Sequence, residues 1–228
     1  MTETTSPDDN KEGDDERKET EEENNDKKKR PIYTKKGDEG KSTLYNLEKR
    51  LKSDDVFEAL GDCDETNVAV GLARVHVEKD TVETFRDVLG HLEIVQSRLL
   101  DCGSAIATPL TSKNTNDSLI ARIKFEDGHC AKLEEWMDKY DEELPKLTNF
   151  LCPGGTKFSA FLHQARATCR RCERRVAPMV KRGDVEPTVL QYLNRLSDFL
   201  FIVARIANKR VNVEDIAYVK ALATVKIL

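Results

Sequence analysis

Apolar side chains recur every three or four residues through most of the chain beyond residue 50, which is the spacing of a helix face that packs against a core. Five segments carry this pattern, and their ends are marked by capping residues, proline or glycine. The predicted helices span about 53–77, 80–102, 116–144, 156–182 and 186–209. Because little of the chain alternates as strands do, the pattern predicts an all-α fold, a five-helix bundle.

The core of this bundle follows from the same pattern. The first helix contributes Val56, Leu60, Val68, Leu72 and Val75; the second, Phe85, Val88, Leu89, Leu92, Val95 and Leu99; the third, Ile120, Ile123, Leu133, Trp136 and Met137; and the fifth, Val189, Leu193, Leu196, Leu200 and Val203. Gly128 is expected to interrupt the third helix. Residues 147–155 are predicted to be extended and to end in a tight turn, and residues 212–228 to form a partial strand or an extra helix.

The first 30 residues differ from the rest in charge. They hold 12 acidic and 7 basic residues with almost no large apolar side chain, and their net charge of −5 equals that of the whole chain. Such a tail cannot bury enough apolar surface to offset the entropy lost on ordering, so we expect residues 1–30 to be disordered. Residues 31–228 balance 30 acids against 30 bases and have the length of one compact domain.

These numbers disfavour several classes of protein. Balanced charge in residues 31–228 argues against nucleic-acid binding, which requires an extended basic surface. No apolar run approaches the ~20 residues of a membrane span. The N-terminus resembles neither a secretory signal nor a mitochondrial presequence. The alternative that it is a processed or incomplete end of a longer precursor stays open. The six cysteines are scattered, which favours free intracellular thiols over a disulfide framework.

The fourth predicted helix is unusually rich in arginine. At about 100° per residue, Arg170, Glu173 and His163 all lie within about 60° of Arg166 around the helix. Arginine presents a planar fork that matches phosphate oxygens, so this face suggests a polyphosphate site. The alternative is a solvated basic face whose charges pair along the helix.

Two shorter segments also carry candidate chemistry. The loop 34–43 places Gly37 and Gly40 among lysines and hydroxyl residues, which suits an anion, although its order differs from a Walker A motif and a plain surface turn is the alternative. In the acidic segment 61–67, Asp64 lies beside the apolar face of its helix and needs a partner. An arginine of the fourth helix is the candidate, and a metal site or an exposed face are the alternatives.

Two features of the later helices are less specific. Cys169 and Cys172 are interpreted as structural thiols, because a redox Cys-x-x-Cys pair begins a helix and no second ligand pair for zinc is present. Asn194 lies one helical turn from Asp198 and is a candidate site residue. The alternative is that it is an ordinary amide on the helix face whose hydrogen bonds are satisfied.

Together these segments resemble the PduO-type ATP:cob(I)alamin adenosyltransferases over about residues 32–209. The motifs that carry the resemblance are, in order, Tyr33-Thr-Lys-x-Gly-Asp-x-Gly40, Lys52, Gly61-x-x-Asp64-Glu65-x-Asn67, Phe150-x-x-Pro-Gly-Gly155, His163-x-x-Arg166-x-x-x-Arg170-Arg171-x-Glu173-Arg174 and Leu193-Asn-Arg-Leu-Ser-Asp198. Their shared order is far more specific than any one of them. The chain departs from the family pattern at Asp62, Thr66 and Cys152, which concerns local packing.

The resemblance implies a homotrimer in which ATP lies between the N-terminal loop of one subunit and the arginine helix of the next. The contacts it implies from the loop are Thr34, Lys35, Lys36, Gly37, Ser42, Thr43 and Lys52, and those from the helices are Arg170, Arg171, Cys172, Glu173, Arg174 and Asn194. The catalytic residues it implies are Arg170, Arg174, Phe150, Arg166 and Asp64. No metal ligand is expected among the side chains, and magnesium is expected with ATP.

The implied roles are specific. Asp64 is expected to pair with Arg166 and to order the site. Phe150 is expected to lie beneath the corrin and to displace its lower ligand. Arg170, Arg174 and Lys35 are expected, with magnesium, to stabilise charge on the triphosphate.

The implied reaction transfers the 5′-deoxyadenosyl group of ATP to cob(I)alamin and releases triphosphate. Cobalt(I) is itself the nucleophile, so the protein need not supply one. The alternative is a non-enzymatic carrier that binds ATP and cobalamin and delivers the cofactor to a mutase. The family also implies methylmalonyl-CoA mutase and a cobalamin reductase as partners, and a mitochondrial location for a eukaryotic chain, with a cytoplasmic one as the alternative.

Overall fold

The computed structural model describes residues 1, 33, 35 and 37–220. Residues 2–32, Thr34, Lys36 and residues 221–228 lie outside this description, and the predicted disordered tail lies there with them. The chain divides into two compact units, Met1–Glu39 and Gly40–Leu228. In the first unit, Lys35 has a left-handed φ of 56° and its carbonyl accepts a hydrogen bond from Asp38 N at 3.3 Å, which forms a tight turn.

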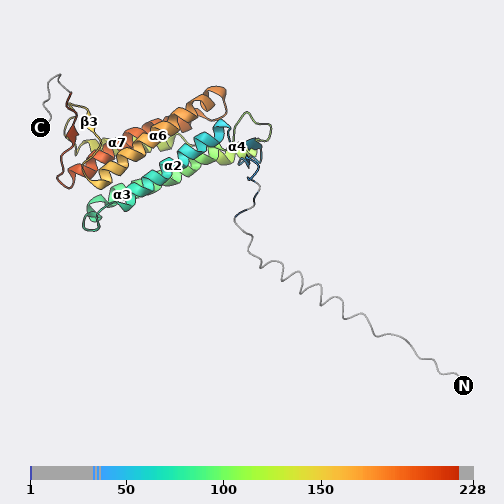
Figure 1. The fold of residues 1–228 in the computed structure, drawn as a ribbon, viewed down its shortest axis with the longest axis horizontal. Helices are drawn as coiled ribbons and strands as arrows, with labels where there is room; N and C mark the ends of the chain where they lie inside the picture. Colours follow the sequence, from blue (N-terminus) through green and yellow to red (C-terminus); the bar gives the residue numbers. More distant parts are fainter. Residues whose placement is uncertain (2–32, 34, 36, 221–228) are drawn as a thin grey trace. The chain divides into compact units, whose positions relative to one another are not determined.

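The second unit is built from long helices packed side by side (Figure 1). Its described helices are α2 (Asp55–Val75), α3 (Arg86–Ile106), α4 (Asp117–Ile123), α5 (Gly128–Asp141), α6 (Lys157–Arg182) and α7 (Pro187–Lys209). α6 packs against both α2 and α7, while α3 packs against α2 and α5 against α7. The predicted all-α fold class is confirmed. Within the described ranges, no helix is both long and apolar enough to cross a bilayer.

The ends of α6 and α7 follow from local sequence. At the N-cap of α6, Thr156 Oγ1 accepts a hydrogen bond from Ser159 N at 3.1 Å. Gly183 closes the helix with a φ of 81°, a conformation that glycine adopts without strain. Pro187 then fits the first turn of α7, where its missing N–H costs nothing. The predicted boundaries of these two helices are therefore correct to within one residue.

Two other helices differ from their predictions. Residues 79–85 form two 3₁₀ turns, Lys79–Thr81 and Glu83–Phe85, so α3 begins only at Arg86. The third predicted helix is divided, because the backbone at Lys124 is extended and Phe125 turns inward to be buried 5.1 Å from the ring of Tyr192. The interruption was predicted at Gly128, but it precedes this residue, which begins α5.

Four short strands complete the described fold. β1 (Lys41–Thr43) pairs antiparallel with β2 (Lys49–Leu51), so the interpretation of this region as a loop was incomplete. β3 (Leu151–Cys152) pairs antiparallel with β4 (Ile216–Ala217). The second pair agrees with the predicted extended segment and with the strand alternative for the C-terminal piece.

The core matches the predicted apolar faces of α3 and α7 but not that of α2. Val68, Leu72 and Val75 are 55%, 39% and 75% exposed, although they were predicted to be buried. The buried face of α2 consists mainly of smaller side chains: Val56, Ala59, Cys63, Thr66, Ala69, Val70 and Ala73. Small side chains allow α6 to pack closely against this face, and they leave the larger apolar stripe outside.

Candidate functional site

Three arginines of α6 follow one another at intervals of four residues and form one row along the helix. These residues, Arg166, Arg170 and Arg174, are called the open row below. Within the described residues none of them has a carboxylate at ion-pair distance; Arg174 instead donates from Nη1 to the carbonyl of Arg170 at 3.0 Å. Arg170 and Arg174 are exposed, and Nε of the half-buried Arg166 has no hydrogen-bond partner in the part of the chain that the structure describes. The open row therefore presents cationic donors to an outside anion.

The electrostatics of the open row favour such an anion. Burial lowers the pKa of Arg166, and the positive charge of Arg170 lowers it further. His163, only 5% exposed, precedes Arg166 by one turn, and its Nδ1 has no partner among the described residues. Burial and the neighbouring Arg166 also lower the pKa of His163, so this imidazole is neutral near pH 7. A bound anion would relieve the repulsion within the row.

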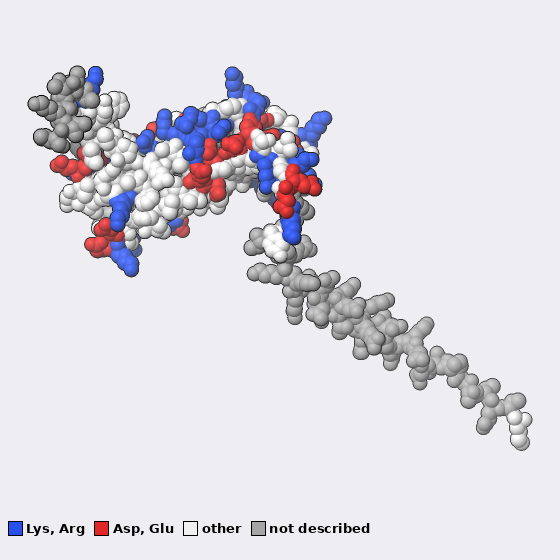
Figure 2. All heavy atoms as spheres, in the orientation of Figure 1, with Lys and Arg blue, Asp and Glu red and all other residues white. Residues whose placement is uncertain are grey.

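A second set of arginines lies about 120° further around α6 at about 100° per residue. These residues, Arg171, Arg175 and Arg182, are called the paired row because acids of α2 neutralise them. Arg171 contacts Asp62 at 2.7 Å and also pairs with Glu65, Arg175 contacts Glu58 at 3.2 Å, and Arg182 contacts Asp55 at 2.6 Å. Figure 2 shows basic side chains gathered over α6 with acidic side chains beside them over α2. Arg171, predicted to contact ATP, thus already has two carboxylate partners.

Glu173 and Asn194 connect α6 to α7. Asn194 Nδ2 donates to Glu173 Oε1 at 2.9 Å. Next to it, Arg195 pairs with Glu134 of α5 at 2.8 Å and with Asp198 at 3.4 Å. The two predicted ATP contacts are therefore brought together, and the hydrogen bond fixes the orientation of the Asn194 amide.

The cysteines of α6 face the core. Cys169 and Cys172 are both fully buried and free. Cys169 Sγ donates to the carbonyl of Leu193 at 3.2 Å. Burial raises the pKa of the Cys169 thiol, and a hydrogen bond with Cys63 together with burial raises that of Cys172. The prediction that Cys172 contacts ATP conflicts with this burial, while the interpretation as structural thiols agrees with it.

Asp64 lies apart from the open row within the chain. Its side chain is exposed, and it lines a hollow of about 510 Å³ between α2 and α3 together with Tyr45, Leu60, Asn67 and Leu99. The nearby acids Asp62 and Glu65 turn toward α6 instead, because neighbouring residues of a helix point about 100° apart. An Asp64–Arg166 pair is not formed inside one chain, so the prediction now requires two subunits.

The predicted contacts from the glycine loop divide between the two units. Ser42 is half-buried on β1, and Thr43 and Lys52 are exposed on and just after the hairpin of β1 and β2. The hairpin is fastened to the end of α3, because Tyr45 N donates to the carbonyl of Ala107 at 3.1 Å. Lys35 and Gly37 belong to the first unit, and Thr34 and Lys36 are outside the described residues.

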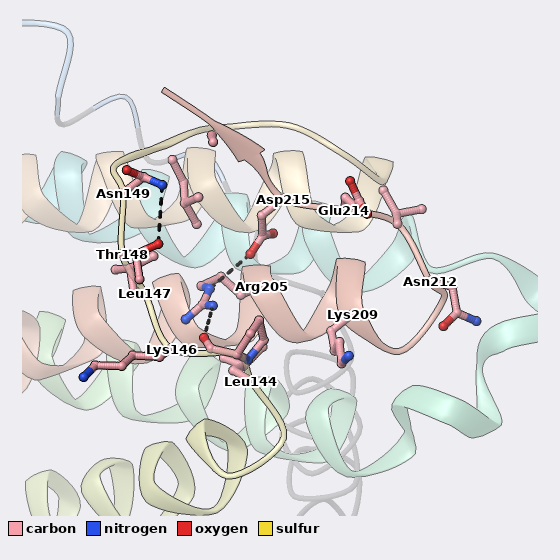
Figure 3. A pocket seen from close by; sticks show the side chains of 14 residues that line it. Leu144, Lys146, Leu147, Thr148, Asn149, Arg205, Lys209, Asn212, Glu214 and Asp215 are labelled. Carbon is pink, nitrogen blue, oxygen red and sulfur yellow. Dashed lines mark hydrogen bonds and ion pairs between the residues drawn. The ribbon is translucent and has the colours of Figure 1, made fainter. Parts of the chain in front are cut away.

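Phe150 is 84% exposed, an unusual state for a large aromatic side chain. It directly precedes β3, and its carbonyl accepts a hydrogen bond from Tyr218 N at 2.7 Å. Beside it, the segment 144–149 and residues 212–217 enclose a cavity of about 570 Å³ against α7 (Figure 3). The sequence therefore placed Phe150 correctly in an extended segment that leaves its ring available.

Sequence reasoning missed two polar residues that lie beneath this segment. Arg205 and Asn208 are 4% and 2% exposed, and both bond to the chain around Phe150. The available signal was their position, since Arg205 interrupts an otherwise apolar run from Phe199 to Ala207 at the end of α7 and Asn208 directly follows it. Polar residues in such a run need buried partners.

Comparison with known proteins agrees with this geometry. Residues 32–207 match the sequence profile of the family described as cobalamin adenosyltransferase. The chain belongs to this family. It is 42% identical over 189 residues to the corrinoid adenosyltransferase MMAB of Homo sapiens, covering 83% of this chain and 73% of the human protein. It is 39% identical over 179 residues to the corrinoid adenosyltransferase of Mycobacterium leprae, covering 78% of this chain and 91% of that protein.

The fold is shared with solved members of the family. A variant of the PduO-type ATP:corrinoid adenosyltransferase from Lactobacillus reuteri, complexed with cobalamin and ATP, has a TM-score of 0.74 and 32% identity, covering 82% of this chain and 99% of that one. A further variant of the same enzyme, complexed with ATP, has a TM-score of 0.72 and 32% identity at the same coverage. The open row and Phe150 both lie inside the region matched by the family.

Proposed function

We propose that the protein transfers the 5′-deoxyadenosyl group of ATP to cob(I)alamin, giving adenosylcobalamin and triphosphate. The observation that carries this proposal is the open row. Its three arginines have no carboxylate partner among the described residues, whereas the other row on the same helix is neutralised by α2. A polyphosphate is the ligand that such a row of guanidinium groups fits best, and the similar Lactobacillus reuteri enzyme was solved with ATP and cobalamin bound.

In the proposed reaction, the cobalt(I) of the corrinoid substrate attacks the 5′ carbon of ATP, and the carbon–oxygen bond to triphosphate breaks. The protein therefore has two tasks, which are to position the two substrates and to stabilise the growing charge on the leaving group. Arg170 and Arg174 suit the second task because they are exposed and need not leave a carboxylate to bind a phosphate oxygen. Glu173 and Asn194, joined by their hydrogen bond, orient the nucleotide beside them.

The opposite side of the proposed nucleotide site is the glycine loop and hairpin of a neighbouring subunit. Its contacts would be Thr34, Lys35, Lys36, Gly37, Ser42, Thr43 and Lys52. Magnesium would be held by the phosphate oxygens and water, since no group of three or more His, Cys, Asp or Glu side chains in the described residues is placed to hold a metal ion. Arg171 and Cys172 are left out of the proposed site, because one is paired with acids and the other is buried.

Phe150 is proposed to act on the corrin. Its exposed ring would lie against the lower face of the macrocycle and take the place of the lower axial ligand. Removing that ligand makes the cobalt easier to reduce to the nucleophilic state. An aromatic side chain that is 84% exposed in the free chain is also expected to be covered by a ligand or partner when the protein works.

The separation of these residues within one chain supports a site shared between subunits. Asp55, which follows Lys52 closely, pairs with Arg182 at the C-terminal end of α6. Arg170 is twelve residues earlier in α6, about 18 Å along the axis at 1.5 Å per residue, and Thr156 is about 39 Å away. A homotrimer in which the hairpin of one subunit faces the open row of the next would bring the two sets together.

An exposed apolar stripe on α2 suggests the surface of this assembly. Val68, Leu72 and Val75 remain more than a third exposed, and Asp64 lies one turn before Val68. A contiguous apolar surface of this kind marks an interface. Contact between copies along this stripe would place Asp64 near the open row of the neighbour, where it could pair with Arg166.

The proposal extends to cellular context. By the same likeness we propose that the product is delivered to methylmalonyl-CoA mutase and that a cobalamin reductase supplies the reduced substrate. For a eukaryotic source the proposed compartment is the mitochondrion, with the cytoplasm as the alternative.

An anaerobic assay with reduced cobalamin and ATP tests the proposed reaction. We expect the absorption spectrum of adenosylcobalamin to appear together with an equal amount of triphosphate. Absence of alkylation at saturating substrates would contradict the proposal. The variant Arg170→Ala separates an enzyme from a carrier, because an enzyme loses turnover whereas a carrier binds cobalamin as before and releases no triphosphate from either form.

A further inference from the structure

Phe150 lies in the segment from Pro145 to Thr156, and Arg205 fastens the beginning of this segment. This guanidinium is 4% exposed on α7, and its Nη2 donates to the carbonyl of Pro145 at 2.8 Å. Its Nε donates to Asp215 Oδ2 at 3.1 Å, immediately before β4. Figure 3 shows both contacts at the wall of the cavity. One buried side chain thereby connects α7 to the start of the segment and to the strand that pairs with it.

The end of the same segment is fastened by Asn208. Its Oδ1 accepts hydrogen bonds from Thr156 N at 2.9 Å and from Thr156 Oγ1 at 3.2 Å. Its Nδ2 donates to the carbonyl of Gly154 at 3.1 Å and to Asp215 Oδ1 at 3.0 Å. The amide therefore uses both N–H groups and accepts two bonds, which leaves little of its hydrogen-bonding capacity unused.

The fit between Asn208 and the segment requires the glycine at position 155. Gly155 has a φ of 93°, and a Cβ added there would lie 2.3 Å from Asn208 Oδ1. Both the backbone conformation and the close approach exclude a larger residue. The tight turn at Gly155 and the Asn208 amide therefore fit only each other, and we treat them as one structural unit.

The position of Phe150 depends on its backbone because its ring has little packing of its own. Between the two fastened ends, regular structure is limited to the two residues of β3, which pair with β4. Asp215 contacts both Arg205 and Asn208 and so ties β4 to the same buried groups. Buried polar side chains of this kind are costly unless they are fully bonded, and here most of their bonds go to one functional segment.

We propose that Arg205, Asn208 and Asp215 form a latch that positions Phe150 against the corrin, with Asn208 as its central positioning residue. The proposal rests on the proposed function, since it assigns the latch a role in displacing the lower ligand. Without the latch, the segment would still be present but its aromatic ring would no longer be held where that ligand must be excluded. A displacement of about 1 Å at a reacting centre is enough to lower a rate by about a hundredfold.

The latch makes a prediction about substrates that a purely structural role does not. Cobalamin carries a nucleotide that supplies the lower ligand, whereas cobinamide, a corrinoid without that nucleotide, has only weakly held water there. We expect Asn208→Ala to lower kcat with cobalamin by about a hundredfold and with cobinamide by less than about tenfold. The KM for ATP should stay unchanged, because Thr156 lies fourteen residues, about 21 Å, from Arg170 along α6.

The spectrum of cobalt(II) provides a second readout. With ATP bound, the wild-type chain should convert cob(II)alamin to the form without a lower ligand, and Asn208→Ala should retain the five-coordinate form. Lys209→Ala is the matched control, since Lys209 is the exposed neighbour of Asn208 on the same turn and lines the cavity beside Arg205. If Asn208→Ala does not fold, Arg205→Lys takes its place. Lysine keeps a positive charge near Asp215 but lacks the planar fork that also reaches the carbonyl of Pro145. This variant should show the same substrate preference to a smaller degree.

The outcomes separate the latch from the proposed function. A selective loss with cobalamin in either variant supports the latch. Equal losses with both corrinoids in a folded variant, or no loss, would overturn the latch while wild-type alkylation still stands. No alkylation by the wild-type chain with either corrinoid would overturn the proposed function, and the role of the latch with it.

Discussion

The open row and the paired row use the same residue type on the same helix for different purposes. Arg171, Arg175 and Arg182 face α2, which places Asp55, Glu58, Asp62 and Glu65 opposite them. Arg166, Arg170 and Arg174 face no carboxylate among the described residues. The difference arises on α2, because Asp55, Glu58, Asp62 and Glu65 repeat at helical spacing along the side that faces the paired row. An arginine-rich helix thus acquires a structural side and a ligand side from its neighbour.

The two rows also differ in what they cost the free protein. Exposed ion pairs such as those of the paired row contribute little to stability individually, about 0–1 kcal/mol each. In the open row like charges lie together, burial and the charge of Arg170 lower the pKa of Arg166, and Arg166 Nε has no hydrogen-bond partner among the described residues. Such an arrangement is unfavourable until an anion binds, and for this reason it marks the site more clearly than the number of arginines does.

The largest expected effect is on catalysis through the open row. We expect Arg170→Ala to lower kcat/KM for ATP by about 10²–10³, since this is the usual loss when one preorganised charge-stabilising group is removed. Thermal stability should change little, because the exposed Arg170 side chain has no ion pair to lose among the described residues. The anaerobic alkylation assay and a melting curve measure the two effects. Arg175→Ala, the same change in the paired row, is the control, and an equal loss of activity there would remove the distinction.

A second expected effect is on stability through the paired row. Among the described residues, Arg171→Ala leaves Asp62, whose side chain is 12% exposed, with Arg175 at 3.7 Å as its one cationic partner. We expect the free energy of unfolding to fall measurably, because a mostly buried carboxylate loses its closest partner. Activity at saturating ATP should stay within about threefold. Denaturant titration checks the stability, and a collapse of kcat with unchanged stability would show that Arg171 belongs to the ligand side.

A smaller effect is expected from the pair itself. A double-mutant cycle of Arg171→Ala and Asp62→Asn should give a small favourable coupling energy, since the guanidinium is partly exposed and solvent screens the interaction. The same cycle on Arg170 and Asp62 should give a coupling near zero. Comparable coupling in both cycles would mean that the two rows share their acids in solution.

The smallest effect concerns pH and the histidine beside the open row. The pKa of His163 is lowered in the folded chain, whereas the pKa of a histidine in an unfolded chain is about 6.5. A lowered pKa in the folded state gives stability that is present above about pH 6.5 and is lost as pH falls through the folded pKa. We expect His163→Gln to flatten the decline in unfolding free energy over this window. Identical slopes for the variant and the wild type would mean that His163 is not held neutral.

Much of the fold could be predicted from local sequence because its signals are local. Thr156, Gly183 and Pro187 mark the ends of α6 and α7 whatever surrounds them. The existence of an arginine face was visible as well, since it depends only on helical geometry. The predicted contacts of Arg170, Arg174 and Asn194 with ATP remain predictions, although the structure leaves these groups exposed.

What could not be predicted depends on neighbours in space. Arg170 and Arg171 are adjacent and alike, and only the acids of α2 separate their roles. Val68, Leu72 and Val75 are spaced like the residues of a helix face that packs in a core, yet they are exposed. Sequence periodicity cannot distinguish such a face from an interface between copies of the chain. Asn208 was missed because its partners lie about fifty residues earlier, in a segment whose shape depends on the amide.

Binding of inorganic triphosphate to the wild-type chain and to two variants tests the central claim most directly, because triphosphate is the proposed leaving group. Calorimetric titration should show that Arg170→Ala weakens the Kd at least about tenfold, which corresponds to about 1.4 kcal/mol. Arg171→Ala should change the Kd by less than about threefold, since its guanidinium is already paired. Equal weakening by the two changes, or a loss confined to Arg171→Ala, would contradict the division of α6 into a ligand side and a structural side.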